Sequence, residues 1–178
     1  MDFQEIEQYI ETGSWNCRYS LDRFVEQIQM WENGIDTDVK LEMNPDFQRG
    51  HVWTEKQQIA FIESILRGGA KNARTIYFNH PNWMRINSKT YDEFVCVDGL
   101  QRYTAIKKFI NNELKVFDCR YKDFTGRLRM MHDMYINVND LPSRKDVLRW
   151  YIEFNSGGTV HSDDEIERVK KLLEAESK

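Results

Sequence analysis

The stretch of sequence that decides the fold reads Val95-Cys96-Val97-Asp98-Gly99-Leu100-Gln101-Arg102, in the middle of a chain of 178 residues. Its first residues are apolar and include two β-branched valines, which predicts a buried strand. The amphipathic residues 103–110 that follow predict a helix. Asp-Gly between the two is typical of a sharp turn. The pattern therefore indicates a strand that ends at Asp98 and passes through a tight turn directly into a helix.

The first turn of that helix has the chemistry of a phosphate site. A helix N-terminus presents unpaired N–H groups and a partial positive charge, and Gly99 lets the backbone approach a ligand closely. Arg102 adds a planar fork of donors that matches phosphate oxygens. The competing interpretation is a tight structural turn with Arg102 in a surface salt bridge. The residues of this stretch leave both interpretations open.

A second polar stretch precedes another predicted helix and carries the same Gln-Arg pair. It reads Asn44-Pro45-Asp46-Phe47-Gln48-Arg49-Gly50-His51-Val52-Trp53. The aromatic residues Phe47 and Trp53 either anchor this loop so that the guanidinium of Arg49 faces a pocket, or serve only as core residues. Two Gln-Arg pairs beside two helix starts indicate a bipartite anion site.

A third polar stretch, residues 153–162, lies between two predicted helices. It contains Asn155, paired glycines at 157–158 and Thr159. One interpretation is a helix C-cap followed directly by the N-cap of the next helix. The functional interpretation is a polar loop that closes over a ligand.

Predicted helices and strands interleave along the chain. Helices are predicted to begin after Thr54, Ser143 and Ser162, because each hydroxyl stands three positions before an acid or amide, the spacing of a capping box. Apolar residues at helical spacing predict another helix over residues 20–33. Strands are predicted over residues 39–43, 75–78, 93–97, 114–117 and 134–138. The pattern predicts a mixed α+β (α/β) protein with a small sheet flanked by helices.

Composition excludes several classes of protein. The chain is 40% hydrophobic and 30% charged, which excludes a disordered or collagen-like chain. Its longest apolar runs have four residues, as at 59–62, so no membrane span is expected. The acidic N-terminus does not resemble a signal peptide, and we expect a cytoplasmic protein. The three cysteines are far apart, which predicts reduced and mostly buried thiols.

The charge balance limits the expected partners. The net charge is −4, so the chain as a whole has no basic footprint for sequence-independent binding of nucleic acid. A local basic groove remains compatible with this balance.

Three stretches, taken in chain order, resemble the DGQQR-motif family, a branch of the ParB/sulfiredoxin superfamily seen in the GmrS half of GmrSD modification-dependent restriction systems. They are the N-P-x-x-x-R box with its Val-Trp at 44–53, the helix end at 62–68 and the turn at 97–102. Residues 150–161 resemble the family's N-x-G-G-T-x-H ending. The resemblance spans residues 38–173. It implies a ParB/sulfiredoxin-like nucleotide-binding domain over 38–178, with C-terminal helices, and an N-terminal helical extension over 1–37.

The resemblance implies binding of a nucleoside triphosphate, and it leaves the need for Mg²⁺ open. Asp98, Arg102 and Arg49 take the catalytic roles if the nucleotide is hydrolysed, although Asp98 is equally explained as a structural turn residue. Carried over by position, the nucleotide-binding residues are Gln48, Arg49, Gly99, Gln101, Arg102, Asn155 and Thr159. No metal ligands are assigned.

The sequence departs from the family pattern in three places. Leu100 replaces the first Gln of the motif, so one polar contact is missing or moved. Residues 71–74 (Lys-Asn-Ala-Arg) occupy the place of an aromatic-Pro-Ile-Pro segment, so the base or ribose edge of the pocket is expected to differ. The sequence also ends near the closing motif, and a separate nuclease subunit is therefore one of the partners to test.

We therefore predict a stand-alone nucleotide-binding domain that acts as a switch in a defence or counter-defence system, with slow NTP hydrolysis left open. The alternative is a non-catalytic module that keeps the fold and binds a partner protein or nucleic acid. Besides the nucleotide, a nuclease subunit, DNA or a second copy of the chain remain open as partners, and no membrane partner is expected. Measured nucleotide turnover separates the two functions.

Overall fold

The computed structural model describes residues 15–48, 50, 52–84, 86, 88–156 and 163–176. Within these ranges, a five-stranded mixed sheet and five α-helices confirm the predicted α+β class. The strands are β1 (Trp15–Tyr19), β2 (Leu41–Glu42), β3 (Thr75–Asn79), β4 (Phe94–Asp98) and β5 (Met134–Asn139). The helices are α1 (Leu21–Glu32), α2 (Glu55–Leu66), α3 (Leu100–Ile110), α4 (Arg144–Ser156) and α5 (Asp163–Ala175). In the part of the chain that the structure describes, no helix is long and apolar enough to cross a membrane.

The strand order places the predicted turn next to the start of β3. The sheet runs β1-β5-β3-β4-β2, with β3 parallel to β5 and β2 parallel to β4. Strand β4 is antiparallel to β3, and Tyr77 lies opposite Asp98, with an irregularity in the register directly after Tyr77. The end of β4, from which α3 starts, therefore lies beside the first half of β3.

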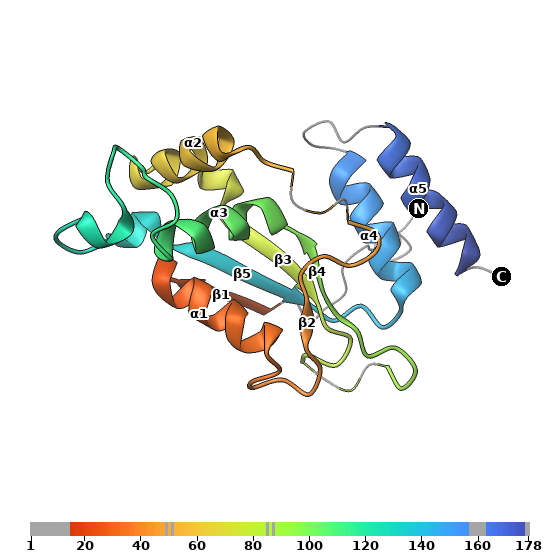
Figure 1. Cartoon of the computed structure of the whole chain (residues 1–178). Coiled ribbons are helices and arrows are strands. Elements are labelled where there is room, and N and C mark those ends of the chain that lie inside the picture. The colour runs from red at the N-terminus through yellow and green to blue at the C-terminus, as the bar shows by residue number, and fades with distance from the viewer. Residues whose placement is uncertain are drawn as a thin grey trace, which may run out of the picture.

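Alternating side chains of β4 divide the interior into two cores. Phe94 and Cys96 belong to a first core, whereas Val95 and Val97 belong to a second core on the opposite face of the sheet, as the pleat of a strand requires. Figure 1 shows α1 and α3 along one face and α4 at the other. The helices contribute to the first core Leu21, Phe24, Val25, Ile28, Trp31, Ile62, Ile65, Leu100, Tyr103, Ala105, Ile106 and Phe109, and to the second core Val147, Leu148, Trp150, Tyr151 and Val169.

The predicted helix starts at Thr54 and Ser143 are confirmed. The backbone N–H of Gln57 donates to Thr54 Oγ1 over 3.4 Å, and the backbone N–H of Thr54 donates to Gln57 Oε1 over 2.9 Å. Before α4, the backbone N–H of Asp146 donates to Ser143 Oγ over 3.2 Å. Helix α5 begins at the expected position, but the cap predicted at Ser162 lies outside the described residues.

We expect Thr54→Ala to lower the free energy of unfolding by about 0.5–2 kcal/mol, because the first turn of α2 loses its side-chain acceptor. Chemical denaturation monitored by circular dichroism measures this change. Thr90→Ala, at an exposed loop position, serves as the matched control. Equal unfolding midpoints for the two variants would contradict the capping role of Thr54.

The strand predicted over residues 114–117 is wrong. The structure has only an isolated bridge between Val116 and Cys119, because the chain reverses between them. Phe117 and Asp118 make this reversal with positive φ angles of 51° and 60°. A local run of alternating apolar residues therefore ends in a tight loop instead of entering the sheet. The strand expected over 39–43 is also shortened, to β2.

Strand β1 was not among the predicted strands. Its residues pair with β5 in antiparallel register, with Trp15 opposite Val138. Helix α1 also lies in the first core. The boundary after residue 37 stays a prediction, and the structure places β1 and α1, both N-terminal to it, in the same sheet and core as the rest of the chain.

Candidate functional site

Gly99 forms the turn between β4 and α3 and is required there by its backbone and by its neighbours. It is the N-cap of α3 with φ of +119°, a conformation that side chains other than glycine rarely adopt. A Cβ atom at this position would lie 2.7 Å from Cγ1 of Ile76 on β3. The turn is therefore closely packed against the neighbouring strand.

Arg102 and Asp98 form an ion pair across the first turn of α3. The Nη2 group of Arg102 donates to Oδ2 of Asp98. The side chains are 12% and 27% exposed, so this pair is mostly shielded from solvent. A carboxylate beside a helix N-terminus is favoured by the helix dipole. The structure thus brings a guanidinium and a carboxylate together at the point where the sequence predicts a phosphate site.

Gln101 joins this turn to the loop before α2. Its Nε2 donates to the carbonyl of Gly50 over 2.7 Å, and its Oε1 accepts from the backbone N–H groups of Val52 and Trp53 over 2.9 and 3.1 Å. One amide side chain therefore holds both ends of the segment 50–53 against the start of α3.

Gln48 makes the reciprocal connection from the loop to the strand. Its Nε2 donates to the carbonyl of Cys96 over 2.8 Å and to that of Val97 over 3.3 Å. The two stretches that the sequence singled out are thus in contact through both glutamines. These amide groups bond to backbone, and direct contacts from them to phosphate stay a prediction.

Two arginines that the sequence analysis did not identify hold the loop from the other side. The guanidinium of Arg168 on α5 donates to the carbonyls of Asp46, Phe47 and Gln48, the last two over 2.8 and 3.2 Å. Arg144 on α4 forms an ion pair with Asp46 at 2.6 Å. Neither arginine belongs to a recognisable motif, because their partners come from a loop far away in the sequence.

The aromatic contacts of the C-terminal end of α4 lie near the turn. The ring of Phe154 lies 4.8 Å from that of Tyr77 between centroids, and Tyr77 is the partner of Asp98 in the sheet. Asn155 follows Phe154, and its Nδ2 donates to the carbonyl of Tyr151 over 2.7 Å. The predicted ligand residue Asn155 is thus bonded within its own helix.

The structure therefore gathers five of the predicted site residues at one junction, namely Gln48, Asp98, Gly99, Gln101 and Arg102. Arg49 and Thr159 lie outside the described residues. Within the described ranges, no group of three or more His, Cys, Asp or Glu side chains has a metal-binding arrangement.

The Cys96 thiol next to this junction is buried and unreactive. Cys96 is fully buried in the strand that leads to the turn, and its burial raises the pKa of the thiol. A thiol that stays protonated is a poor nucleophile. The polar chemistry at the junction thus comes from the side chains of Asp98 and Arg102 and from the backbone N–H groups of α3.

We expect Gln101→Ala to lower the free energy of unfolding by about 1–3 kcal/mol, because two backbone N–H groups and one carbonyl lose their partner. Gln29→Ala on α1 is the control for removing a half-buried glutamine from a helix. Hydrogen exchange at Val52 and Trp53 reports on the loop itself. Unchanged exchange rates in Gln101→Ala would contradict the role of Gln101 in holding residues 50–53 against the start of α3.

The fold and the junction define a mixed α+β domain in which a polar loop is locked onto a strand–turn–helix unit. Residues 29–170 match the family model of the GmrSD restriction endonuclease N-terminal domain, and the chain belongs to this family. Searches of the curated proteins and of the solved structures found no match. Family membership gives the chain a role in a restriction system, and it confirms the GmrSD part of the resemblance.

Proposed function

We propose that this domain is a nucleoside-triphosphate-binding switch of a restriction system, of ParB/sulfiredoxin-like type, with the phosphates at the N-terminus of α3. The observation that carries the proposal is the three-bond clamp of Gln101, which fixes the loop after Gln48 directly onto the turn that bears Arg102. Gln48, Gln101 and Arg102 thus belong to one polar junction. Arg49 follows Gln48 in the sequence, and we propose that it acts at the same site.

The start of α3 supplies donors that suit an anion. Because its N-cap is a glycine, no side chain of the N-cap bonds to the helix. The backbone N–H of Leu100 faces the thiol of Cys96, so the N–H groups of Gln101 and Arg102 are those that we expect to donate to a ligand. Their orientation and the partial positive charge of the helix favour phosphate oxygens. Arg102 adds a guanidinium, which bonds phosphate with two parallel N–H groups.

The carboxylate of Asp98 makes magnesium a fitting companion of the nucleotide. Asp98 repels phosphate unless a cation neutralises it, and in the free protein Arg102 does so. Mg²⁺ is commonly held by one or two carboxylates together with the phosphates of the substrate. In this arrangement Asp98 would bind the ion while Arg102 turns to the phosphates, so we expect Mg²⁺ to tighten binding.

Slow hydrolysis of the nucleotide needs no further type of residue. Phosphoryl transfer depends mainly on positioning and on stabilisation of negative charge, which Arg102, Arg49 and the α3 N-terminus would supply. A switch of this kind acts on a partner. We propose that the partner is a nuclease subunit and that both proteins act in the cytoplasm.

Calorimetric titration with each of the four NTPs, with and without Mg²⁺, tests the proposal, and released phosphate measures turnover. We expect at least one NTP to bind, and to bind more tightly with Mg²⁺. Saturating ligand at 100 times its Kd would stabilise the fold by about 2.7 kcal/mol, which a thermal-shift assay detects. If no NTP binds under either condition, the nucleotide proposal fails and a non-catalytic partner-binding module replaces it.

A further inference from the structure

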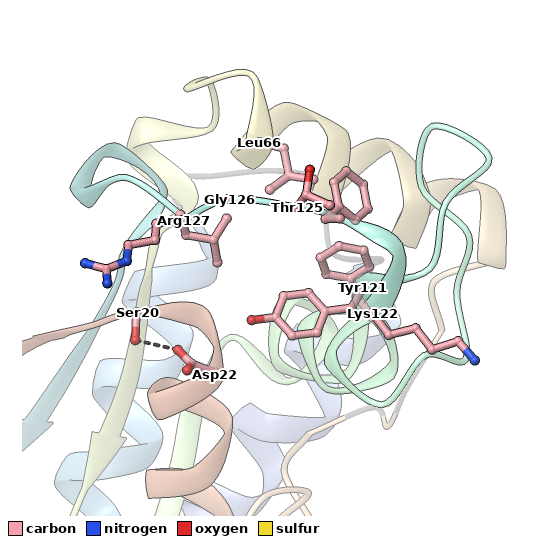
Figure 2. A pocket seen from close by; sticks show the side chains of 11 residues that line it. Ser20, Asp22, Leu66, Tyr121, Lys122, Thr125, Gly126 and Arg127 are labelled. Atoms are coloured by element: carbon pink, nitrogen blue, oxygen red, sulfur yellow. Dashed lines mark hydrogen bonds between the residues drawn. The ribbon is translucent and has the colours of Figure 1, made fainter.

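A hollow lies at the opposite end of α3 from the junction. Its volume is about 600 Å³, and it is lined from the start of α1, the end of α2, the end of α3 and the loop 121–128. Figure 2 shows the hydroxyl of Tyr121 pointing toward Asp22 across this hollow, while Lys122 and Arg127 extend outward. Figure 1 shows the segment between α3 and β5 reaching out beyond the sheet, beside α2.

Aromatic rings form one wall of this hollow. The buried ring of Phe109 packs edge-on against Tyr121 at 5.4 Å and against Phe124 at 5.8 Å between centroids. Phe124 nevertheless remains 41% exposed. A ring that is fixed from behind and open in front is a platform on which a planar ligand ring can stack.

The opposite wall carries a permanent hydrogen-bond acceptor. The hydroxyl of Ser20 donates to Oδ1 of Asp22 over 2.5 Å, and this bond lowers the pKa of Asp22. Burial, together with the charge of Asp22, raises the pKa of Tyr121. At neutral pH the hollow therefore holds an ionised carboxylate that accepts, next to a protonated phenol that can donate.

Two cations, Lys122 and Arg127, line the hollow, and the segment that contains them is rich in cations. Residues 111–132 contain five cations and three acids in a chain whose net charge is −4. Among the described residues, none of these five cations forms an ion pair, and all five are exposed, namely Lys115, Arg120, Lys122, Arg127 and Arg129. Arg67 at the end of α2 adds a further exposed guanidinium, which lies 4.8 Å above the ring of Phe117. This local excess of cations suits a polyanion.

We propose that this hollow binds an unpaired nucleotide of a single-stranded nucleic acid. Its base stacks on Phe124 and Tyr121, an exocyclic amine donates to Asp22, and the adjoining phosphates contact Lys122 and Arg127. Only an unpaired base fits this arrangement, because bases inside a duplex are already stacked and paired. The site is distinct from the triphosphate junction, which lies at the other end of α3.

The carboxylate of Asp22 predicts which bases bind. Cytosine, adenine and guanine carry an exocyclic amine that can donate to it, as cytosine does to acidic side chains. Thymine and uracil lack this amine, and their N3–H donor is flanked by two carbonyl oxygens, which the ionised carboxylate repels. We therefore expect a short dC homopolymer to bind more tightly than dT by about fivefold to tenfold at neutral pH.

Fluorescence anisotropy with labelled dC and dT single strands tests the proposal. Asp22→Asn should remove the difference between dC and dT, and Phe124→Ala should weaken both strands by roughly tenfold. Affinity falls as salt rises, and the double variant Lys122→Ala/Arg127→Ala should make this dependence less steep. The slope of log affinity against log salt should shrink in magnitude by about 1.4, at about 0.7 per lost phosphate contact. Lys145→Ala/Lys171→Ala, on the helices α4 and α5, is the matched control and should leave the slope unchanged.

Other results would overturn the proposal. The first is equal affinity of the wild type for dC and dT, and the second is equal or tighter binding of a duplex. The third is competition by free dCMP: if dCMP displaces the labelled strand at the same concentration as unlabelled strand does, the ligand is a free nucleotide. Absence of binding to any strand at low salt would also overturn the proposal, and a protein would then be the partner to test for this surface. Arg102→Ala should keep the affinity for dC, and Asp22→Asn should keep the affinity for NTP, so this site and the triphosphate site fail separately.

Discussion

Arg102→Ala should lower the affinity of the domain for nucleoside triphosphate at least about tenfold and leave the fold intact. A charge-assisted hydrogen bond contributes about 1.5–3 kcal/mol, and each 1.4 kcal/mol is tenfold in affinity. The Arg102 side chain is only 12% exposed and lies at the start of α3, where the phosphates are proposed to bind. Calorimetric titration of the variant against the wild type measures the loss.

Three further variants decide how Arg102 acts. Arg102→Lys should restore binding only in part, because an ammonium group cannot make two parallel bonds to a phosphate. Arg18→Ala is the matched control. Arg18 lies on the edge strand β1 and also forms an ion pair, with Asp133 at 3.4 Å. Arg49→Ala should weaken binding in the same direction. If Arg102→Ala changes only the melting temperature, the ion pair with Asp98 is structural.

Asp98→Asn separates the two roles of the carboxylate. If Asp98 binds Mg²⁺, the variant should bind triphosphate without Mg²⁺ as well as the wild type or better, because a repelling charge is gone. It should also lose most of the gain in affinity that Mg²⁺ gives the wild type. A variant that retains the full magnesium effect would assign Asp98 to the turn alone.

The elements that could be predicted from the sequence are those whose signals are local. The caps at Thr54 and Ser143 act on N–H groups within three residues, so α2 and α4 begin where they were expected. Strand β1 carries no comparable signal, since the strand with which it pairs among the described residues, β5, lies far away in the sequence. The apolar pattern at 114–117 is also local, but the positive φ of Phe117 diverts the chain.

The site was predictable in its parts and not in its connections. The two Gln-Arg stretches were recognised, and the structure places Gln48 and Gln101 in contact with each other's segments. Which groups a glutamine bonds depends on the fold around it, so the sequence could not distinguish a ligand contact from a clamp. Arg168 is the clearest example, because its three carbonyl partners are fixed only when α5 packs beside the loop.

Gly99→Ala should be the most destabilising single substitution of the turn, lowering the free energy of unfolding by about 2–6 kcal/mol. One part of the loss is backbone strain, of about 1–3 kcal/mol, because φ is +119°. The other part is overpacking of about 1–3 kcal/mol, since the new Cβ would lie 2.7 and 2.8 Å from Cγ1 and Cγ2 of the buried Ile76. Native domains are stable by only about 5–15 kcal/mol, so the loss should be plain in chemical denaturation.

The structure also supplies the variants that separate strain from overpacking. Gly126 has φ of +91° and no atom within 4 Å of its ideal Cβ position, so Gly126→Ala should show the strain alone. In an Ile76→Ala background, Gly99→Ala should cost less than in the wild type, because the two nearest atoms are removed, and a double-mutant cycle measures this coupling. Zero coupling would mean that the turn does not rest on β3. A positive coupling would tie the position of the α3 N-terminus, and with it the proposed phosphate site, to the neighbouring strand.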